Sequence, residues 1–232
     1  MGAVQVVTGY IPIKGHPRTA EEYGKLGEKI FIPLVTAGVN CKRYMEPLES
    51  CWLHKYVSRA KQQPAPSVGD NAAKNTLAYH IVQHQKFAWL LKAAIEDPRP
   101  DTYVWLDYGI GHVPGVDPVV IGDFLDKVVA STDDVVHIPG CWPKDAEKVH
   151  MGYPCWRFCG GVMVVPRRRV HRLYKAVKTA ALRHIDLTKN VEWEVNTLAR
   201  VELANTVPIR WYRADHNETM FTAYVPSEAP QA

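Results

Sequence analysis

The run Tyr-Val-Trp-Leu-Asp-Tyr-Gly at residues 103–109 constrains the fold of this chain more than any other segment. An apolar, β-prone stretch ends abruptly in one carboxylate, Asp107, and Gly109 follows two residues later. A strand that is apolar on both faces is typical of a sheet covered by helices. Ligands of open α/β sheets bind outside the carboxyl ends of the strands, which is where Asp107 would lie.

Asp107 is therefore a candidate for handling a metal ion or a phosphate group. A carboxylate is costly to bury unpaired, so it normally meets a cation or several hydrogen-bond donors. Gly109 permits a sharp turn or the close approach of a ligand. An aspartate that caps the following turn would leave the same pattern, so this stretch alone keeps both interpretations open.

The composition indicates an ordinary globular protein of one domain over residues 1–232, with 47% hydrophobic and 22% charged residues. No apolar run approaches the roughly 18 residues of a membrane span, and the N-terminus lacks a basic secretory leader. We therefore expect no membrane span and a cytoplasmic location, in a bacterial or a virus-infected cell. The five scattered cysteines contain no CxxC pair, which predicts free thiols rather than a zinc site or a disulfide framework.

The net charge of +4 suits an anionic substrate but falls short of the dense basic patch of a nucleic-acid-binding protein. Basic residues do gather at Arg167, Arg168 and Arg169. The solvated start of an amphipathic helix would explain this cluster equally well.

Strand-like and helix-like segments alternate along the chain, which predicts a mostly parallel sheet sandwiched by helices. Thr19 and Glu22 have the spacing of a capping box at the start of the first helix. The expected strands are 4–8, 30–36, 103–107, 135–138, 156–165 and 209–213. The expected helices are 19–29, 44–60, 76–94, 118–129, 170–183 and 193–203. We expect loops at 61–74 and 139–154 and a flexible tail at 225–232.

The glycines match neither the dinucleotide fingerprint nor the P-loop, and no GxSxG elbow occurs. What remains is a set of polar or glycine-rich strand ends, namely Thr8-Gly9-Tyr10, Asp107, Gly160-Gly161 and Asp215-His216. Asp107 offers an oxygen ligand and His216 a nitrogen ligand, which together could hold a Mn²⁺-like ion and leave positions for a diphosphate. Gly160 and Gly161 could let the backbone approach a sugar.

Seven segments, in this order along the chain, resemble the HtrL/YibB-like group of GT-A glycosyltransferases, which use nucleotide-diphosphate sugars. They are VVTGY, RTAEEY, QKFAWLLKAA, VWLDYG, FCGGVMVVP, VEWEVNTL and WYRADHNE. The resemblance implies a GT-A, Rossmann-like fold. It also places Thr8, Gly9 and Tyr10 beside the base and ribose of the nucleotide, with Arg18 and Lys86 near the nucleotide sugar.

The resemblance further implies that Asp107 is the metal-binding carboxylate of the family's DxD signature and that His216 is a late ligand near the diphosphate. Mn²⁺ or Mg²⁺ is the implied cofactor. The chain departs from the signature at its second acidic position, where Gly109 removes one ligand.

Glu192 and Glu194 precede or open the expected helix 193–203, where such transferases often place a base that activates the acceptor. Two residues that are i and i+2 on a helix point about 200° apart, so they cannot both face one site. Glu194 lies nearer the apolar stripe of the helix and is the favoured base, which would make the transfer inverting. Two acidic residues that oppose the helix dipole would give the same pattern.

The sequence thus predicts a glycosyltransferase that moves a sugar from a nucleotide-diphosphate sugar, preferably a UDP-sugar, to a hydroxyl acceptor. The acceptor would be a glycan or a modified base in viral DNA. The alternative is a non-catalytic nucleotide-sugar-binding module with a degraded DxD signature. A nuclease or phosphatase centred on Asp107 is a weaker option, because no other carboxylates cluster near it in the sequence.

Overall fold

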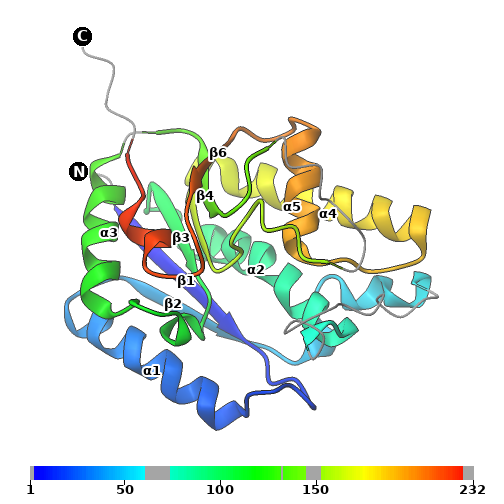
Figure 1. Cartoon of the computed structure of the whole chain (residues 1–232), viewed down its shortest axis with the longest axis horizontal. Coiled ribbons are helices and arrows are strands. Elements are labelled where there is room, and N and C mark those ends of the chain that lie inside the picture. Colours follow the sequence, from blue (N-terminus) through cyan, green and yellow to red (C-terminus); the bar gives the residue numbers. More distant parts are fainter. Residues whose placement is uncertain (1–2, 61–73, 132, 145–152, 227–232) are drawn as a thin grey trace.

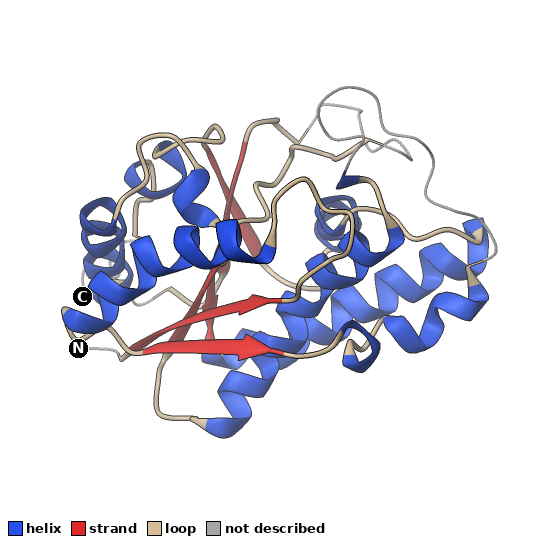
Figure 2. Ribbon diagram, turned by 90° about the horizontal axis from the view of Figure 1, so that it is seen from below, coloured by secondary structure: helices blue, strands red, loops and turns tan. Residues whose placement is uncertain are grey.

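One mixed β-sheet runs through the middle of the molecule (Figure 1), seen from below in Figure 2. The structure is a computed structural model that describes residues 3–60, 74–131, 133–144 and 153–226. Within these residues the sheet has the strand order β2-β1-β3-β5-β4-β6. The strands are β1 (Val4–Tyr10), β2 (Cys41–Met45), β3 (Thr102–Leu106), β4 (Val136–Gly140), β5 (Val162–Pro166) and β6 (Ile209–Arg213).

Strand β5 is antiparallel to both of its neighbours, β3 and β4, whereas the pairs β1–β2, β1–β3 and β4–β6 are parallel. Its first residue, Val162, pairs with Leu106 at the carboxyl end of β3. Its last residue, Pro166, pairs with Thr102 at the beginning of β3. The N-terminal end of β5, here called its entrance, therefore lies beside the carboxyl ends of β1, β3, β4 and β6. These strand ends together form what is here called the ligand-binding edge of the sheet.

Two layers of helices bury the two faces of the sheet in separate hydrophobic clusters. One layer holds α1 (Ala20–Thr36), α3 (Pro118–Ala130) and the short α6 (Thr219–Thr222). The other holds α2 (Leu77–Glu96), α4 (Arg167–Thr188) and α5 (Glu194–Leu203). Short 3₁₀ helices span Leu48–Ser50, His54–Arg59 and Ile110–His112. Among the described helices, none has the length and apolar character that a membrane crossing needs.

The predicted α/β class, with a mostly parallel sheet between helices, is confirmed. The capping box at the start of α1 is present, with the Thr19 hydroxyl accepting from the Glu22 amide and the Glu22 carboxylate accepting from the Thr19 amide. Strand β6 has the predicted bounds. These elements have strong local signals that tertiary packing does not override.

The predicted strand at residues 30–36 is wrong, because these residues complete α1 despite Pro33 inside the helix. Ile30 and Leu34 are buried on one helical face, whereas Ile32 and Val35 are exposed. A short apolar run fits a strand or a helix equally well, and here the period of 3.6 prevails. The second strand is instead the more polar segment Cys41–Met45.

The predicted helix at residues 44–60 is also wrong, because its first two residues end β2 and only 3₁₀ turns follow. Pro47 interrupts the segment and lacks the backbone donor that a continuous helix would need. The predicted strand at 156–165 shortens to β5, so Gly160 and Gly161 lie before the strand rather than within it. Residues 61–73, 145–152 and 227–232 of the predicted loops and tail lie outside the described residues.

Two histidines of α2 are fully enclosed between this helix and α5. The Nδ1–H of His80 donates to the Val191 carbonyl at 3.1 Å, and the Nδ1–H of His84 donates to the His80 carbonyl at 2.8 Å. Burial, the largest cause, lowers the pKa of His80 to about 3 and the pKa of His84 to about 4, from a usual 6.5. Both rings are therefore neutral in the folded protein at neutral pH.

We predict that the free energy of unfolding falls as the pH is lowered from 7 to 5. Between pH 6.5 and the folded pKa values, the unfolded chain binds protons at His80 and His84 that the folded chain does not, so stability rises with pH in this window. Each histidine contributes a slope of up to about 1.4 kcal/mol per pH unit.

Urea denaturation at pH 7, 6 and 5 measures this slope. His84→Gln should flatten the slope whatever its effect at pH 7, whereas His171→Gln, at an exposed position of α4, should leave it unchanged. Equal slopes in His84→Gln and the parent protein would contradict the assignment.

Candidate functional site

A cleft opens at the carboxyl ends of β1 and β3, beside α2 and the beginning of α1. Its position matches the rule for open α/β sheets, in which ligands bind at this edge. The lining is unusually rich in aromatic and basic side chains. The residues that matter most for the argument are Tyr10, His16, Arg18, Tyr23, Lys74, Tyr79, Lys86, Asp107, Tyr108 and His112.

Asp107 follows the last residue of β3 and lies on the cleft wall with 33% of its side chain exposed. Its backbone amide donates to the Gly161 carbonyl at 2.9 Å, which ties the end of β3 to the entrance of β5. Its Oδ1 accepts from the Trp105 indole at 2.7 Å and lies 3.4 Å from Lys86 Nζ. Asp107 therefore has the cation and the donors that the sequence led us to expect.

Lys86 projects from α2 into the interior, where its side chain is 1% exposed. Its ammonium group donates to the Gly160 carbonyl at 2.8 Å and lies 3.2 Å from Oε1 of Glu194. Burial acts to lower the pKa of Lys86, but the charges of Asp107 and Glu194 outweigh burial, so the pKa is raised. Lys86 thus stays charged and connects α2, β3, the entrance of β5 and α5.

Gly160 lies so close to the Lys86 cluster that a side chain there would displace Glu194. A Cβ atom at this position would lie 2.2 Å from Oε1 of Glu194 and 3.3 Å from Lys86 Nζ. Any side chain there would push the carboxylate away from the ammonium group. The glycine pair therefore permits a close approach within the protein itself.

Two further basic residues line the same cleft as Asp107. Arg18 precedes the N-cap of α1, and Lys74 lies shortly before the N-cap of α2. Burial, with help from the Arg18 charge, lowers the pKa of Lys74, and Asp107 acts in the opposite direction. Three cations and one half-buried carboxylate thus line the cleft, which suits it to an anion.

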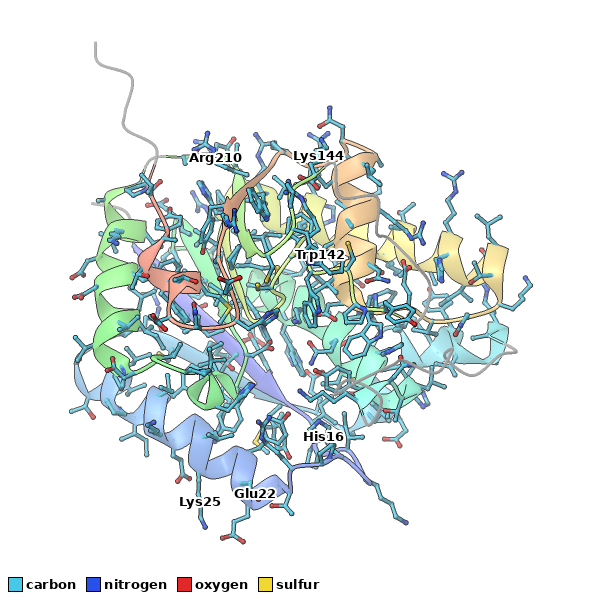
Figure 3. The ribbon with its side chains drawn as sticks, in the orientation of Figure 1. His16, Glu22, Lys25, Trp142, Lys144 and Arg210 are labelled. Carbon is cyan, nitrogen blue, oxygen red and sulfur yellow. The ribbon has the colours of Figure 1, made fainter. Side chains whose placement is uncertain are left out.

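Aromatic rings form the wall next to these charges. Tyr10 lies with its ring centroid 5.1 Å from that of Tyr23 and 5.6 Å from that of Tyr108. His16 stacks on Tyr79 at 5.8 Å, and Figure 3 places His16 near the first turn of α1, where Glu22 is labelled. Burial lowers the pKa of His16, so its ring is neutral at neutral pH. Such a surface can stack with a flat heterocycle.

The three predicted nucleotide-contacting residues of β1 are placed differently from one another. Gly9 and Tyr10 line the cleft, whereas Thr8 is 1% exposed and is not among the lining residues. A Cβ atom on Gly9 would lie 2.3 Å from the Trp89 ring, so packing against α2 alone requires a glycine there. Their contacts with a nucleotide stay predictions.

The two candidate bases have different surroundings, but Glu192 lies before α5, so the helix geometry used in the prediction does not apply to this pair. Glu194 contacts Lys86 but is 4% exposed and does not line the cleft. Glu192 accepts from Arg200 Nε at 2.9 Å and from the Thr197 hydroxyl at 3.2 Å, on the other side of the segment. Its contacts are those of a buried structural ion pair. The catalytic role of either residue stays a prediction.

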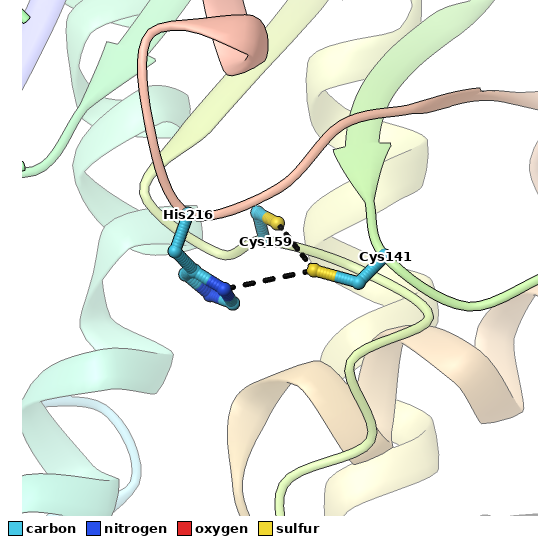
Figure 4. Close-up of side chains that lie close together, drawn as sticks. All are labelled: Cys141, Cys159 and His216. Carbon is cyan, nitrogen blue, oxygen red and sulfur yellow. Dashed lines mark hydrogen bonds between the residues drawn. The ribbon is translucent and has the colours of Figure 1, made fainter. Parts of the chain in front are cut away.

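His216 lies with two cysteines rather than with Asp107. Its Nδ1 is 3.6 Å from Sγ of Cys141, whose Sγ is 3.7 Å from Sγ of Cys159 (Figure 4). Within the described part of the chain, no hydrogen bond or ion pair joins His216 to Asp107. The two residues that the sequence predicted to share one metal ion, Asp107 and His216, therefore lie in different surroundings.

The cluster Arg167–Arg169 lies at the opposite edge of the sheet from the cleft. It follows Pro166, which pairs with Thr102 at the beginning of β3. Arg169 donates to the carboxylate of Asp134 at 2.7 Å, and Arg167 donates to the Pro98 carbonyl at 2.6 Å. These contacts hold the first turn of α4 in place, and the three arginines are not among the residues that line the cleft.

Sequence reasoning missed several cleft residues. Lys74 fell at the end of a predicted loop, and Tyr23 belongs to the same RTAEEY segment as Arg18 without having been singled out.

The contact between Cys141 and Cys159, outside the cleft, was missed as well. The two residues are 18 positions apart and meet only because β5 runs antiparallel to β4. No local spacing rule could have found that pair.

Neither a protein-family model nor a curated protein matches the chain. Among solved structures, one that is similar to it is a glycosyltransferase involved in the glycosylation of the major capsid of PBCV-1. The two share 16% sequence identity with a TM-score of 0.51, over 92% of this chain and 81% of that chain. The similarity shows that the two chains share a fold. It does not extend to the HtrL/YibB-like group, which stays a prediction.

We predict that Gly160→Ala destabilises the protein by about 1–3 kcal/mol, because the added Cβ atom forces Glu194 from Lys86. Gly122→Ala, in α3, is the control because its Cβ atom would meet nothing within 4 Å. The control should be neutral or slightly stabilising, since alanine favours a helix. Equal unfolding free energies of the two variants in urea would contradict the packing described for Gly160.

Proposed function

We propose that this protein is a glycosyltransferase whose donor is a nucleotide-diphosphate sugar, with a UDP-sugar favoured. The observation that carries the proposal is that Arg18, Lys74 and Lys86 line one cleft together with Asp107, at the carboxyl ends of β1 and β3. The glycosyltransferase fold supports it. Membership of the HtrL/YibB-like group is part of the same proposal.

The charges of the cleft suit a leaving diphosphate. In the transfer, the bond between the anomeric carbon and the diphosphate breaks, and its electron pair leaves with the diphosphate. Fixed cations that face this developing charge lower the barrier most effectively when they are already in place. Lys86 is held rigidly, whereas Arg18 and Lys74 lie on the cleft wall where they can contact phosphate oxygens.

The aromatic wall suits the base of the nucleotide. Tyr10, Tyr23 and Tyr108 already lie with their rings close to one another, so a planar base could extend the stack. The predicted contacts of Gly9 and Tyr10 with the base and ribose agree with this placement, because both line the cleft.

A divalent ion would bind at Asp107 if the chemistry uses one. Mg²⁺ and similar ions are commonly held by one or two carboxylates together with substrate phosphates, so a single aspartate fits this role. Mn²⁺ or Mg²⁺ bound there would supply further positive charge for the diphosphate. Oδ1 of Asp107 already accepts two hydrogen bonds, so Oδ2 is the oxygen that would hold the ion.

The acceptor is a hydroxyl group, whose oxygen forms the new bond to the anomeric carbon while its proton passes to a base. Glu194 is the proposed base. Its burial and its contact with Lys86 support a second role, in which it positions the ammonium group and does not touch the acceptor. A DNA acceptor gains no support from Arg167–Arg169, because that cluster lies at the other edge of the sheet.

A donor-binding measurement tests the proposal first. We expect one class among UDP-, GDP-, CDP- and dTDP-sugars to raise the melting temperature, because a ligand that binds only the folded state stabilises it. Arg18→Ala should weaken donor binding about tenfold or more, as the loss of a charged hydrogen bond implies. Lys25→Ala, an exposed residue of α1 paired with Glu21, removes the same charge and should leave binding unchanged.

The same panel, repeated with Mn²⁺ and with EDTA, separates the possible donor sites. A shift that is lost in EDTA and in Asp107→Ala supports a metal at Asp107. A shift that persists in EDTA assigns charge neutralisation to the three cations. Donor binding without release of nucleotide diphosphate to any acceptor would support the alternative, a non-catalytic sugar-nucleotide-binding module. The absence of any shift would refute the donor assignment.

Glu194→Gln distinguishes the two proposed roles of this residue. As the base, Glu194 would be needed only for transfer, so kcat should fall at least about 100-fold while the Kd of the donor stays constant. As a positioning residue, it would act through Lys86, so the Kd of the donor should rise as well. Gln preserves the shape of the side chain, and Glu192→Gln provides the matched control. An unchanged kcat and Kd would remove Glu194 from both roles.

A further inference from the structure

Cys141, Cys159 and His216 form a cluster at the same sheet edge as the cleft but on other strands (Figure 4). Cys141 follows β4, Cys159 precedes β5 and His216 follows β6. One ligand atom from each residue lies within 4.8 Å of the other two. Burial is graded across the cluster, with Cys159 buried, Cys141 half-buried and His216 exposed.

Two of the three spacings among these atoms match the edges of a tetrahedron around zinc, and the third, between Cys159 and His216, is within 4.8 Å. With Zn–S bonds of about 2.3 Å and Zn–N bonds of about 2.0 Å, tetrahedral angles put two sulfurs about 3.8 Å apart and a sulfur and a nitrogen about 3.5 Å apart. The observed distances are 3.7 Å between the sulfurs and 3.6 Å between Cys141 Sγ and His216 Nδ1. A disulfide would require the two sulfurs at about 2.05 Å.

The backbone holds all three ligand-bearing segments in place without any metal. The Cys159 amide donates to the Pro139 carbonyl at 2.7 Å, and the Cys141 amide donates to the Trp156 carbonyl at 2.8 Å. The Ala214 amide donates to the Gly140 carbonyl at 2.9 Å, just before His216. The Trp156 ring packs edge-on against the His216 ring, with centroids 4.3 Å apart. The ligands are therefore preorganised.

We propose that Cys141, Cys159 and His216 bind one zinc ion, with the fourth position open to water on the exposed side of His216. Two thiolates and an imidazole form a soft ligand set that selects Zn²⁺ over Mg²⁺ or Mn²⁺. This site does not include the hard oxygen ligand Asp107, and it assigns His216 to the two cysteines. The proposal does not depend on the glycosyltransferase function.

Zinc at this site would fix the segment that supports the cleft. Cys159 directly precedes Gly160 and Gly161, whose carbonyls accept from Lys86 Nζ and from the Asp107 amide. A metal on Cys159 therefore anchors the chain one residue before the Lys86 cluster. The ion would act as a structural clip between β4, β5 and β6.

Metal binding by the reduced full-length chain tests the site without any donor or acceptor. We expect one equivalent of zinc after dialysis, measured by elemental analysis, and thiolate charge-transfer bands when Co²⁺ is titrated into the metal-free protein. Cys141→Ser should weaken zinc binding at least about 100-fold, as should His216→Gln. Cys41→Ser, at a cysteine of similar exposure in β2, should retain full binding.

Each alternative gives a distinct result. A reduced chain that binds Co²⁺ without charge-transfer bands, or a Cys141→Ser variant that binds zinc like the parent, would overturn the proposal. A Cys141–Cys159 disulfide that forms in air in a chain that binds no zinc when reduced would overturn it as well. Circular dichroism establishes that each variant folds. If EDTA lowers the melting temperature with no donor present, in the parent but not in Cys141→Ser, the effect belongs to this site rather than to Asp107.

Discussion

The buried ammonium group of Lys86 is the interaction on which the functional edge of the sheet depends. A cation in the interior carries a large desolvation cost unless carboxylates and hydrogen-bond acceptors surround it. Asp107, Glu194 and the Gly160 carbonyl provide these partners. The requirement fixes several other features at once, because α2 must approach the end of β3 and α5 must begin beside them. A side chain at position 160 would displace Glu194 from the ammonium group. The cleft is the exposed side of this arrangement.

The reversed direction of β5 decides which chemical groups share an edge with the cleft. Because β5 starts where its neighbours end, the glycine pair and Cys159 come to the ligand-binding edge. For the same reason the basic start of α4 is carried to the far edge, where its arginines bind local acceptors. A sheet with β5 parallel would have exchanged these two groups. The antiparallel strand therefore places the Gly161 carbonyl beside Asp107 and the Cys159 thiol at the same edge of the sheet, rather than guanidinium groups.

The sequence allowed the fold class, most helices and the central strand with Asp107 to be predicted, because their signals are local. Thr19 with Glu22 marks a helix start, and the apolar run before Asp107 marks a buried strand. The predictions were wrong where one pattern fits two periods, as in residues 30–36. For the site, the strand pattern predicted Asp107 at a ligand-binding edge, and the family resemblance implied Arg18 and Lys86. All three line the cleft, whereas the Cys141–Cys159 contact could not be predicted. Such a contact depends on strand direction, which no short window of sequence encodes.

The cluster around Lys86 also has a consequence for how the molecule is assembled. Lys86 meets Gly160 across 74 residues and Glu194 across 108 residues, so these contacts close long loops. Contacts of large sequence separation carry a higher entropic cost and slow the folding of the parts that depend on them. On the ribosome, Lys86 emerges well before its last partner is made. A chain that ends before Glu194 would contain β1 and β3 with Asp107, yet would leave the buried cation one carboxylate short. The cleft is therefore completed only by a nearly full-length chain.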